Sequence, residues 1–418
     1  MKRTTLTLLL ALLLCGCSAR TELTVETEEK ELPVEETQSE SAPEPPAQPF
    51  AQDSITVEGN IATIRLGGQQ SYDSICLQGL SKAGELMICI DEEEIYMQEN
   101  GSVDRWCYIG EQDADTITVQ LPEGCSLDQF GLSEPSKDEN SRLSAYLPYS
   151  FYTDTMLSDG SLEFLNELTI NVGCYWRADG TLEVKNGLKE TIHAIQAAYP
   201  ELTIYCTINP KQGGAAAIMT EDARQTLTDS MLNFCDETEI DGVDIDWEFP
   251  AEDQWDEFSA LIVSLSEALS SADRSLSLAF YPEDVILSPE AVKAIHKVNV
   301  MAYDQFDEQG RHSTYETADD AIDYFLTLGF EAEQLSLGIP AYGRPLSGEA
   351  QWPLYYEYTE QLACGQNLIG DSYFNSTPLA QDKAIFARES GLQGIFLYHL
   401  ACDDQTHSLT TAAAQALK

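Results

Sequence analysis

Lysine and arginine are scarce in this sequence. Its 418 residues contain 22 Lys and Arg against 71 Asp and Glu, which gives a formal net charge of −49 at pH 7. A chain with this charge repels polyanions, so nucleic acids and anionic membrane surfaces are excluded as expected partners. The balance predicts a soluble, self-repelling surface that acts on neutral or cationic material.

The histidine and cysteine patterns of a metal site are lacking as well. The chain has five His, and its eleven Cys show no metal-ligand spacing, so no metal is predicted. If Cys15 is removed and Cys17 is modified, an odd number of cysteines remains, which does not indicate a disulfide framework. Three are expected to be small buried residues, namely Cys174, Cys206 and Cys235. Four others could form pairs, namely Cys76, Cys89, Cys107 and Cys125.

The N-terminal apolar stretch, residues 6–14, is too short to span a bilayer. Residues 1–17 place two basic residues, this apolar run and small residues before Cys17, which is typical of a processing segment. The ending Leu-Cys-Gly-Cys resembles a bacterial lipobox. It predicts cleavage before Cys17, lipidation of that residue, and a lipid anchor that holds the protein in the cell envelope outside the cytoplasm. An ordinary cleaved signal peptide on a secreted protein is the alternative, because Cys15 is an imperfect occupant of its position.

Residues 18–52 contain nine Glu and five Pro and almost nothing apolar to bury. This composition predicts a disordered, extended linker. Fully stretched, it could reach on the order of 100 Å and hold a folded body away from the envelope.

Residues 53–137 predict a small all-β, sandwich-like module, because short apolar strands alternate with Gly, Asp and Asn turns. No aromatic platform specific for sugar is evident, and Tyr96 and Trp106 are interpreted as core or ordinary surface residues. We therefore expect a spacer or a barrel-packing role, with the boundary near residues 134–139. The expected strands are 55–57, 61–66, 86–90, 95–98, 106–109 and 116–121.

From residue 142 to residue 418 strands alternate with helices, which indicates an α/β fold with a parallel sheet. The clearest helix is 255–269, whose apolar residues share one face. Eight strands in about 277 residues match the size of a (β/α)8 TIM barrel. The expected strands are 143–147, 168–172, 202–208, 242–248, 276–281, 298–303, 335–340 and 394–399.

The most informative stretch is residues 240–250, where apolar residues alternate with Asp244, Asp246 and Glu248. The period of two predicts a strand that projects the three carboxylates from one face, with Cα atoms about 7 Å apart. Because full ionisation of such a stack is unfavourable, at least one group should keep a proton near neutral pH. Glu248, at the strand end, is the candidate general acid. A solvated acidic face and a hard-cation site are the alternatives, and the apolar surroundings favour catalysis.

Residues 241–248 resemble the Asp-Gly-x-Asp-x-Asp-x-Glu signature of glycoside hydrolase family 18, the chitinase family. Residues 301–304 resemble its Met-x-Tyr-Asp motif, and 337–344 resemble its Gly-x-Pro-x-Tyr-Gly-Arg segment. Residues 383–404 resemble its closing unit. The resemblance covers roughly residues 142–418 and none of the N-terminal third.

The resemblance implies substrate-assisted, retaining hydrolysis without metal or organic cofactor. Glu248 would protonate the glycosidic oxygen and later deprotonate water. Asp246 would accept the acetamido N–H and Asp244 would tune which carboxyl holds the proton. Tyr303 would donate to the acetamido oxygen, with a core tyrosine as the alternative. Asp304 would contact the sugar or the water.

Other binding candidates follow from the same segments. Met301 belongs to the expected sugar-facing motif, and Arg344 would contact substrate or pair with an acid. Tyr398 stands where the family usually has a tryptophan beneath the reacting sugar. Aromatic residues near predicted loop ends could stack on sugars or belong to the core: Tyr146, Tyr175, Trp176, Trp352 and Tyr355.

Two further differences from the family pattern concern the expected substrate groove. The family's Ser-x-Gly-Gly is represented only by Gly213 and Gly214 behind an insertion that contains Pro210 and Lys211. Only about 50 residues separate Arg344 from the eighth strand, which leaves little room for a large α+β insertion. A shallow, open groove is therefore expected.

The function expected first is hydrolysis of β-1,4-linked N-acetylglucosamine polymers, such as chitin, by a monomer. Trp247 and Pro250 favour a chitin-like substrate. The same signature also serves endo-β-N-acetylglucosaminidases that act on N-glycans, and enzymes that act on peptidoglycan. A non-catalytic sugar-binding protein and a metal-dependent hydrolase remain as the other classes, although the intact Glu248 argues against the former.

Overall fold

A computed structural model describes residues 55–66, 71–135, 141–404 and 408–417, which belong to one compact unit. The expected leader, the lipidation site Cys17 and the acidic linker lie outside the described residues. The expected boundary at 134–139 is only partly described, between strand β8 (Gln129–Ser133) and strand β9 (Arg142–Pro148).

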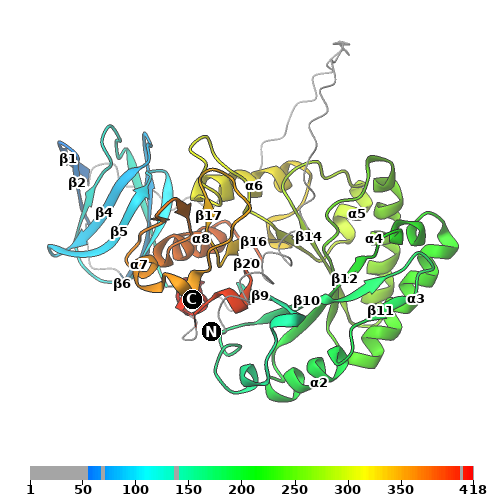
Figure 1. Ribbon diagram of the computed structural model, residues 1–418. Coiled ribbons are helices and arrows are strands. Elements are labelled where there is room, and N and C mark those ends of the chain that lie inside the picture. Colours follow the sequence, from blue (N-terminus) through cyan, green and yellow to red (C-terminus); the bar gives the residue numbers. More distant parts are fainter. Residues whose placement is uncertain (1–54, 67–70, 136–140, 405–407, 418) are drawn as a thin grey trace, which may run out of the picture. The chain divides into compact units, whose positions relative to one another are not determined.

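The N-terminal region is all β and contains two sheets around a shared apolar core (Figure 1). One sheet has the order β1-β2-β7-β4-β5, and the other has the order β6-β3-β8. Its strands are β1 (Ile55–Glu58), β2 (Ile61–Arg65), β3 (Tyr72–Gln78), β4 (Gly84–Ile90), β5 (Glu93–Gly101), β6 (Arg105–Gln112), β7 (Thr116–Gln120) and β8.

The six strands expected in this region are present, and two more, β3 and β8, were missed. In β3 six consecutive residues are buried, so its sequence lacks the apolar–polar alternation on which the prediction relied. Strand β8 is short and has Gly131 at its centre, which weakens a strand pattern.

The C-terminal region is a closed barrel of eight parallel strands, as predicted. The strand order is β10-β12-β13-β14-β15-β16-β20-β9, and pairing of β9 with β10 closes it (Figure 1). After β9 the barrel strands are β10 (Glu167–Trp176), β12 (Thr203–Pro210), β13 (Gly242–Ile245), β14 (Ser275–Phe280), β15 (Lys297–Val300), β16 (Leu335–Pro340) and β20 (Gly394–Tyr398). Their residues are buried almost throughout, since side chains fill the barrel and helices cover it.

Helices surround the barrel (Figure 1). The expected helix at 255–269 is α4 (Trp255–Ser270), which buries Phe258, Ile262, Leu265 and Leu269. The longer partners are α2 (Leu188–Ala198), α3 (Glu221–Thr238), α5 (Pro289–Ala294), α6 (Tyr315–Thr327), α8 (Thr377–Glu389) and α9 (Ser408–Leu417). In the described part of the chain, no helix is long and apolar enough to cross a membrane.

The excursion between β16 and α8 is compact. It holds a small sheet of two-residue strands in the order β17-β19-β18 and the short helix α7 (Thr359–Ala363). The strands are β17 (Arg344–Pro345), β18 (Leu368–Ile369) and β19 (Ser372–Tyr373). This agrees with the short spacing seen in the sequence.

All nine cysteines of the described residues are free thiols. The expected burial of Cys174, Cys206 and Cys235 is confirmed. The pairs considered possible among Cys76, Cys89, Cys107 and Cys125 are not formed, and stability in this region comes from the apolar core between the two sheets.

A buried ion pair lies inside the barrel. The Lys297 ammonium donates to the Glu167 carboxylate and lies 4.4 Å from the centre of the Tyr205 ring. The two charged side chains are 2% and 8% exposed, so neither charge is compensated by water.

We predict that Glu167→Gln lowers the free energy of unfolding by about 3–5 kcal/mol, because it leaves the Lys297 charge buried without its partner. Urea unfolding at pH 7 measures this change. The control is Glu237→Gln at the surface pair with Lys189, whose side chains are 60% and 38% exposed. That variant should lose less than about 1 kcal/mol, and equal losses at the two sites would contradict the prediction.

Candidate active site

The carboxylates of the central stretch gather at the C-terminal end of β13. Asp244 lies within the strand and is completely buried, whereas Asp246 and Glu248 follow the last strand residue, Ile245. The predicted strand 242–248 is therefore too long, because pairing with β12 and β14 stops at Asp244 and Ile245. Asp246 and Glu248 occupy the barrel mouth, where active sites of this architecture lie.

Asp244 is held by donors from four other strands. Its Oδ2 accepts from Tyr146 (3.1 Å) and Thr207 (2.7 Å), and its Oδ1 accepts from Ser277 (2.6 Å) and Asn299 (3.4 Å). Burial raises the pKa of Asp244, while the bonds from Ser277 and Thr207 oppose that shift. The network fixes this carboxyl as the base of the stack.

Asp246 and Glu248 form a hydrogen-bonded pair of carboxyls. Burial, then the Glu248 charge, and then the Asp244 charge raise the pKa of Asp246 well above its usual value. The side chain of Glu248 is exposed at the mouth, but protein atoms surround its carboxyl. This burial raises the pKa of Glu248, and the bond with Asp246 opposes the rise. Both shifts favour the protonated form of a carboxyl in this pair.

The backbone of this segment is fixed from β12. The side-chain oxygen of Asn209 accepts from the Asp246 N–H at 2.8 Å. One carboxyl oxygen of Asp246, Oδ1, is buried and has no hydrogen-bond partner in the structure. This oxygen can accept a hydrogen bond from a donor that enters the site.

Tyrosines line the inner wall beside the pair. The ring of Tyr303 stacks on that of Tyr398 at a centroid distance of 5.7 Å and an interplanar angle of 28°. Burial and then Tyr398, Asp246 and Glu248 raise the pKa of Tyr303 well above its usual value, so its hydroxyl remains a donor. Met301 is 7% exposed and packs in the same cluster. The structure thus brings Tyr303, Met301 and Tyr398 to the carboxylates.

Asp304 and Arg344 pair with one another. The Arg344 guanidinium donates to Asp304 at 2.5 Å, and the Tyr342 hydroxyl donates to it at 3.0 Å. Of the two expectations for Arg344, pairing with an acid is therefore the one observed. Its guanidinium carbon also lies 4.8 Å from the centre of the Trp352 ring and 5.1 Å from that of Phe306.

His312 is a completely buried neighbour of Asp304 and Tyr342 in this group. Its Nε2–H donates to the Tyr373 carbonyl at 3.0 Å, while Nδ1 lies 3.7 Å from Asp304. Burial lowers the pKa of His312 to about 3, so the ring is neutral.

Two of the expected sugar-stacking residues are placed elsewhere. Trp176 is completely buried, and its indole N–H donates to the Gly214 carbonyl at 3.1 Å. Tyr146 is 2% exposed and serves as a donor to Asp244, so neither ring offers a free face. Tyr355 is also buried, whereas Tyr175 and Trp352 are partly exposed. Tyr146 reaches Asp244 inside the barrel and Trp176 packs against Trp247, which their place near a strand end did not reveal.

Thr207, Asn209, Ser277 and Asn299 were not predicted. Thr207 and Ser277 are the register neighbours of Asp244 on the flanking strands, so one level of the barrel interior is polar. A small polar residue within an otherwise apolar buried strand is the sequence signal that could have identified them.

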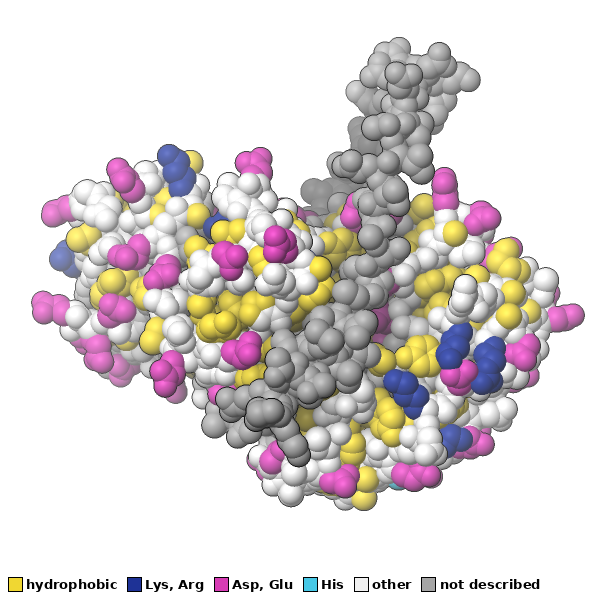
Figure 2. All heavy atoms as spheres, viewed as in Figure 1, with side chains coloured by type: hydrophobic (Ala, Val, Ile, Leu, Met, Phe, Trp, Pro, Cys, Tyr) yellow, Lys and Arg dark blue, Asp and Glu magenta, His cyan; other side chains and the backbone are white. Residues whose placement is uncertain are grey.

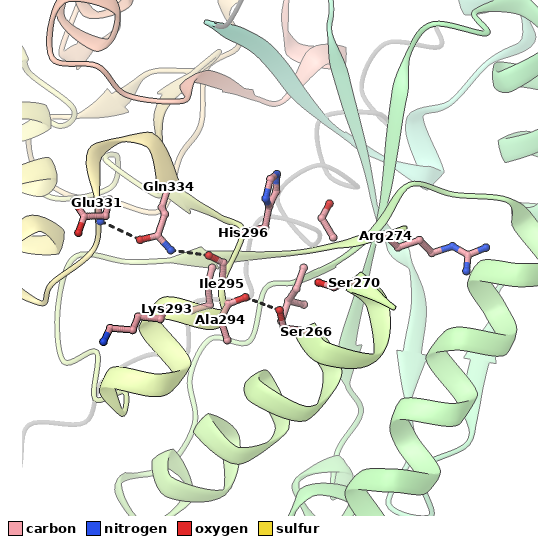
Figure 3. A pocket seen from close by; sticks show the side chains of 11 residues that line it. Ser266, Ser270, Arg274, Lys293, Ala294, Ile295, His296, Glu331 and Gln334 are labelled. Atoms are coloured by element: carbon pink, nitrogen blue, oxygen red, sulfur yellow. Dashed lines mark hydrogen bonds between the residues drawn. The ribbon is translucent and has the colours of Figure 1, made fainter. Parts of the chain in front are cut away.

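A hollow of about 500 Å³ lies at the other end of the barrel strands, near the starts of β14 and β15 (Figure 3). Much of its polar lining is bonded internally, since Ser266 donates to the Ala294 carbonyl and Gln334 donates to the Ile295 carbonyl. It does not contain the carboxylates of the central stretch. In the described residues no group of His, Cys, Asp and Glu is arranged to hold a metal ion.

Acidic side chains are scattered over the face drawn in Figure 2, and basic ones are fewer. This distribution agrees with the net charge of −49. Negative charge therefore predominates on this face (Figure 2), as expected from the composition.

We predict that Asp246→Asn raises Tm at pH 8 by on the order of 2 °C, because it removes a carboxyl whose ionisation is disfavoured in the folded state. A raised folded-state pKa gives stability that is present below the unfolded-state value and lost as pH rises through the folded-state value. The gain should therefore vanish toward pH 4.

Thermal unfolding between pH 4 and pH 8 tests this. The matched control is Asp244→Asn, which should lower Tm, because asparagine keeps only one acceptor oxygen and its NH2 group leaves two of the four donors without an acceptor. A lower Tm at pH 8 in Asp246→Asn would contradict the expectation that ionisation of Asp246 is disfavoured in the folded state.

The sequence model of glycosyl hydrolases family 18 matches residues 106–403. Its match begins in strand β6, earlier than the resemblance at residue 142, so it includes part of the β region. Mouse chitotriosidase-1 is 28% identical over 36% of this chain and 43% of its own length. The chain covers 11%, 43% and 58% of the first three curated relatives that it matches.

Solved structures show the same fold. A family 18 chitinase from the chitin utilization locus of Flavobacterium johnsoniae has a TM-score of 0.60 and 22% identity, over 67% of this chain and 94% of its own. A mutant chitinase from Cycas revoluta, in complex with (GlcNAc)4, has a TM-score of 0.56 and 18% identity, over 66% of this chain and 100% of its own.

The family match spans more than half of the chain and includes the carboxylate segment, the tyrosine wall and the Asp304–Arg344 pair. The closed eight-stranded barrel beneath them is the fold of the solved relatives. The chain belongs to glycoside hydrolase family 18.

Proposed function

We propose that this protein hydrolyses β-1,4 bonds of N-acetylglucosamine-containing glycans, such as chitin or chito-oligosaccharides. The observation that carries the proposal is the pair of neighbouring carboxyls, Asp246 and Glu248, at the barrel mouth beside a buried Asp244 that accepts four hydrogen bonds. The names of the family relatives, which include chitotriosidase and chitinases, support this substrate class.

Glu248 acts as general acid and then general base. It faces solvent at the mouth, and burial raises its pKa, so it can hold a proton at the pH where the glycosidic oxygen needs one. Protonation of that oxygen breaks the bond to the sugar carbon. The deprotonated Glu248 then takes a proton from the water that attacks the same carbon.

The nucleophile is the acetamido oxygen of the substrate, which forms an oxazolinium ion. Asp246 accepts the acetamido N–H and offsets the positive charge, a role that its unpaired, buried Oδ1 can fill. Asp244, held by its four donors, keeps its position while the proton moves between its neighbours. Two displacements at one carbon give retention of configuration.

The tyrosine wall orients the sugar. Tyr303 donates to the acetamido oxygen from its stacked position on Tyr398, and Tyr398 supplies the face beneath the reacting sugar. Asp304, fixed by Arg344 and Tyr342, contacts the sugar or the attacking water. These groups come from one chain, so we propose that the protein acts as a monomer.

We predict that the mature protein cleaves chitin oligosaccharides and that Glu248→Gln loses at least about 10³-fold in kcat, because the amide cannot transfer the proton. Mass spectrometry of the products measures cleavage, with and without a chelator. The matched control is Glu252→Gln, an exposed residue just beyond the site, which should retain activity.

If the parent protein does not cleave chitin oligosaccharides, the proposed substrate is contradicted. N-glycoproteins and peptidoglycan are then the substrates to test, followed by sugar binding without cleavage. Loss of activity with a chelator would favour a metal-dependent hydrolase.

We propose further that the protein is lipid-anchored at Cys17 on the outer side of a bacterial cell membrane. The leader, the small residues and the cysteine occur in the expected order, and the acidic linker 18–52 follows. The anchor would hold the barrel near the membrane while the linker gives it reach toward a polymeric glycan.

We predict that Cys17→Ser moves the protein from the membrane fraction to the medium or the soluble fraction, because the acylated thiol is lost. Fractionation with detection by antibody measures the distribution. Cys15→Ser is the matched control and should leave the protein in the membrane fraction. Equal distribution of parent and Cys17→Ser would indicate an ordinary cleaved signal peptide.

A further inference from the structure

The β region contacts the segments that carry site residues. Residues 301–316 follow β15 and bear Tyr303 and Asp304, and residues 341–376 follow β16 and bear Arg344. Strands β5 and β6 make buried hydrogen bonds to the second segment and to helix α8, and a partly buried one to the first segment. The β region is therefore packed on the supports of the site.

Asp382 of α8 is the centre of this packing. It is completely buried and accepts from the Tyr96 hydroxyl at 2.6 Å and from the Tyr108 N–H at 3.0 Å. The Arg105 guanidinium lies 3.2 Å away and also covers the Tyr315 ring at 4.5 Å. Three groups of the β region thus fix one carboxylate of α8.

The next residue, Lys383, connects α8 to the segment after β15. It is completely buried, and its ammonium donates to the Ser313 carbonyl (2.7 Å), the Ser313 hydroxyl (2.8 Å) and the Asn375 side-chain oxygen (2.6 Å). None of these acceptors is a carboxylate. Burial lowers the pKa of Lys383 well below its usual value, although the nearby Glu316 charge opposes that shift, so an amine held here by neutral oxygens is unfavourable for stability.

Ser313 links Lys383 to the segment that carries Tyr303 and Asp304. Its hydroxyl donates to the Ala302 carbonyl at 2.7 Å. Ala302 lies between Met301 and Tyr303, so this bond fixes the backbone from which the Tyr303 and Asp304 side chains project. Asp304 itself has a φ of 62°, a conformation that persists only where the surroundings impose it.

A second connection runs through Asn367. Its amide donates to the Gln98 side chain of β5 at 2.5 Å, and its side-chain oxygen accepts from the Ser376 N–H at 3.0 Å. The neighbouring Tyr373 carbonyl accepts from His312, which faces Asp304. Both connections begin in the β region and end at the same site segment.

We propose that Lys383 is a positioning residue for Tyr303 and Asp304, and that the β region sets its position through Asp382. The β region is then a structural part of the active site and not a separate sugar-binding module. This inference rests on the proposed function for its kinetic consequence only.

The sharpest test compares two Tyr→Phe changes within the β region. Tyr96→Phe removes the bond to Asp382, whereas Tyr72→Phe removes a bond from the hydroxyl of another buried tyrosine to the Ala114 carbonyl inside the β region. We expect Tyr96→Phe to lower kcat on chitin oligosaccharides about three- to tenfold with KM within about twofold, because Tyr303 and Asp304 are misplaced in the transition state. Tyr72→Phe should keep both constants.

Lys383→Met tests the lysine itself and should lower kcat by about tenfold or more. If this variant fails to fold, Tyr96→Phe decides the question. Equal kinetic effects of Tyr96→Phe and Tyr72→Phe would overturn the proposal, since both would then act through general stability.

Amide hydrogen exchange gives a readout that does not need activity. Tyr96→Phe should speed exchange in peptides that cover residues 301–316, while Tyr72→Phe leaves them unchanged. If the parent protein cleaves none of the glycans but exchange changes as expected, the substrate proposal fails and the positioning role stands. Unchanged exchange in 301–316 would overturn the positioning role whatever the substrate.

Discussion

The unfavourable ionisation of adjacent carboxyls is the constraint on which the site depends. Asp244, Asp246 and Glu248 crowd the end of β13, and burial raises the pKa of each. Donors from β9, β12, β14 and β15 fix Asp244, and the raised pKa values of Asp246 and Glu248 favour protonation within that pair. A slip of one residue in any of these strands would turn its donor out of the interior. The catalytic chemistry proposed here therefore requires the register of the whole barrel.

The sequence predicted the barrel well because its strands are buried runs separated by amphipathic helices, and both patterns are local. The acidic signature likewise placed the carboxylates at the mouth. Burial of single aromatic residues was not predictable, since the period of a strand does not tell which neighbour covers a ring near its end. Trp176 and Tyr146 are the examples, both buried where exposure was considered. Strand β3 escaped notice because it is buried along six residues and shows no alternation.

Arg344 shows a different limit. With 71 acidic residues in the chain, charge alone does not indicate which one an arginine meets. Only the fold brings Arg344, after β16, to Asp304, after β15, and places Phe306 and Trp352 close to the guanidinium. Partners of this kind depend on neighbouring strands that are far apart in sequence, so they follow from topology and not from motifs.

The β region raises the question of what separates a module from a part of a fold. A module that moves independently presents polar residues to water at its boundary. Here the boundary holds a completely buried Asp382, and an Arg388–Asp73 pair of which both side chains are 5% exposed. Without the β region these charges on α8 would lose their partners, and α8 packs directly on β16 and β20, the strands that lead to Arg344 and Tyr398. The family match begins inside β6, the strand of the β region that contacts α8.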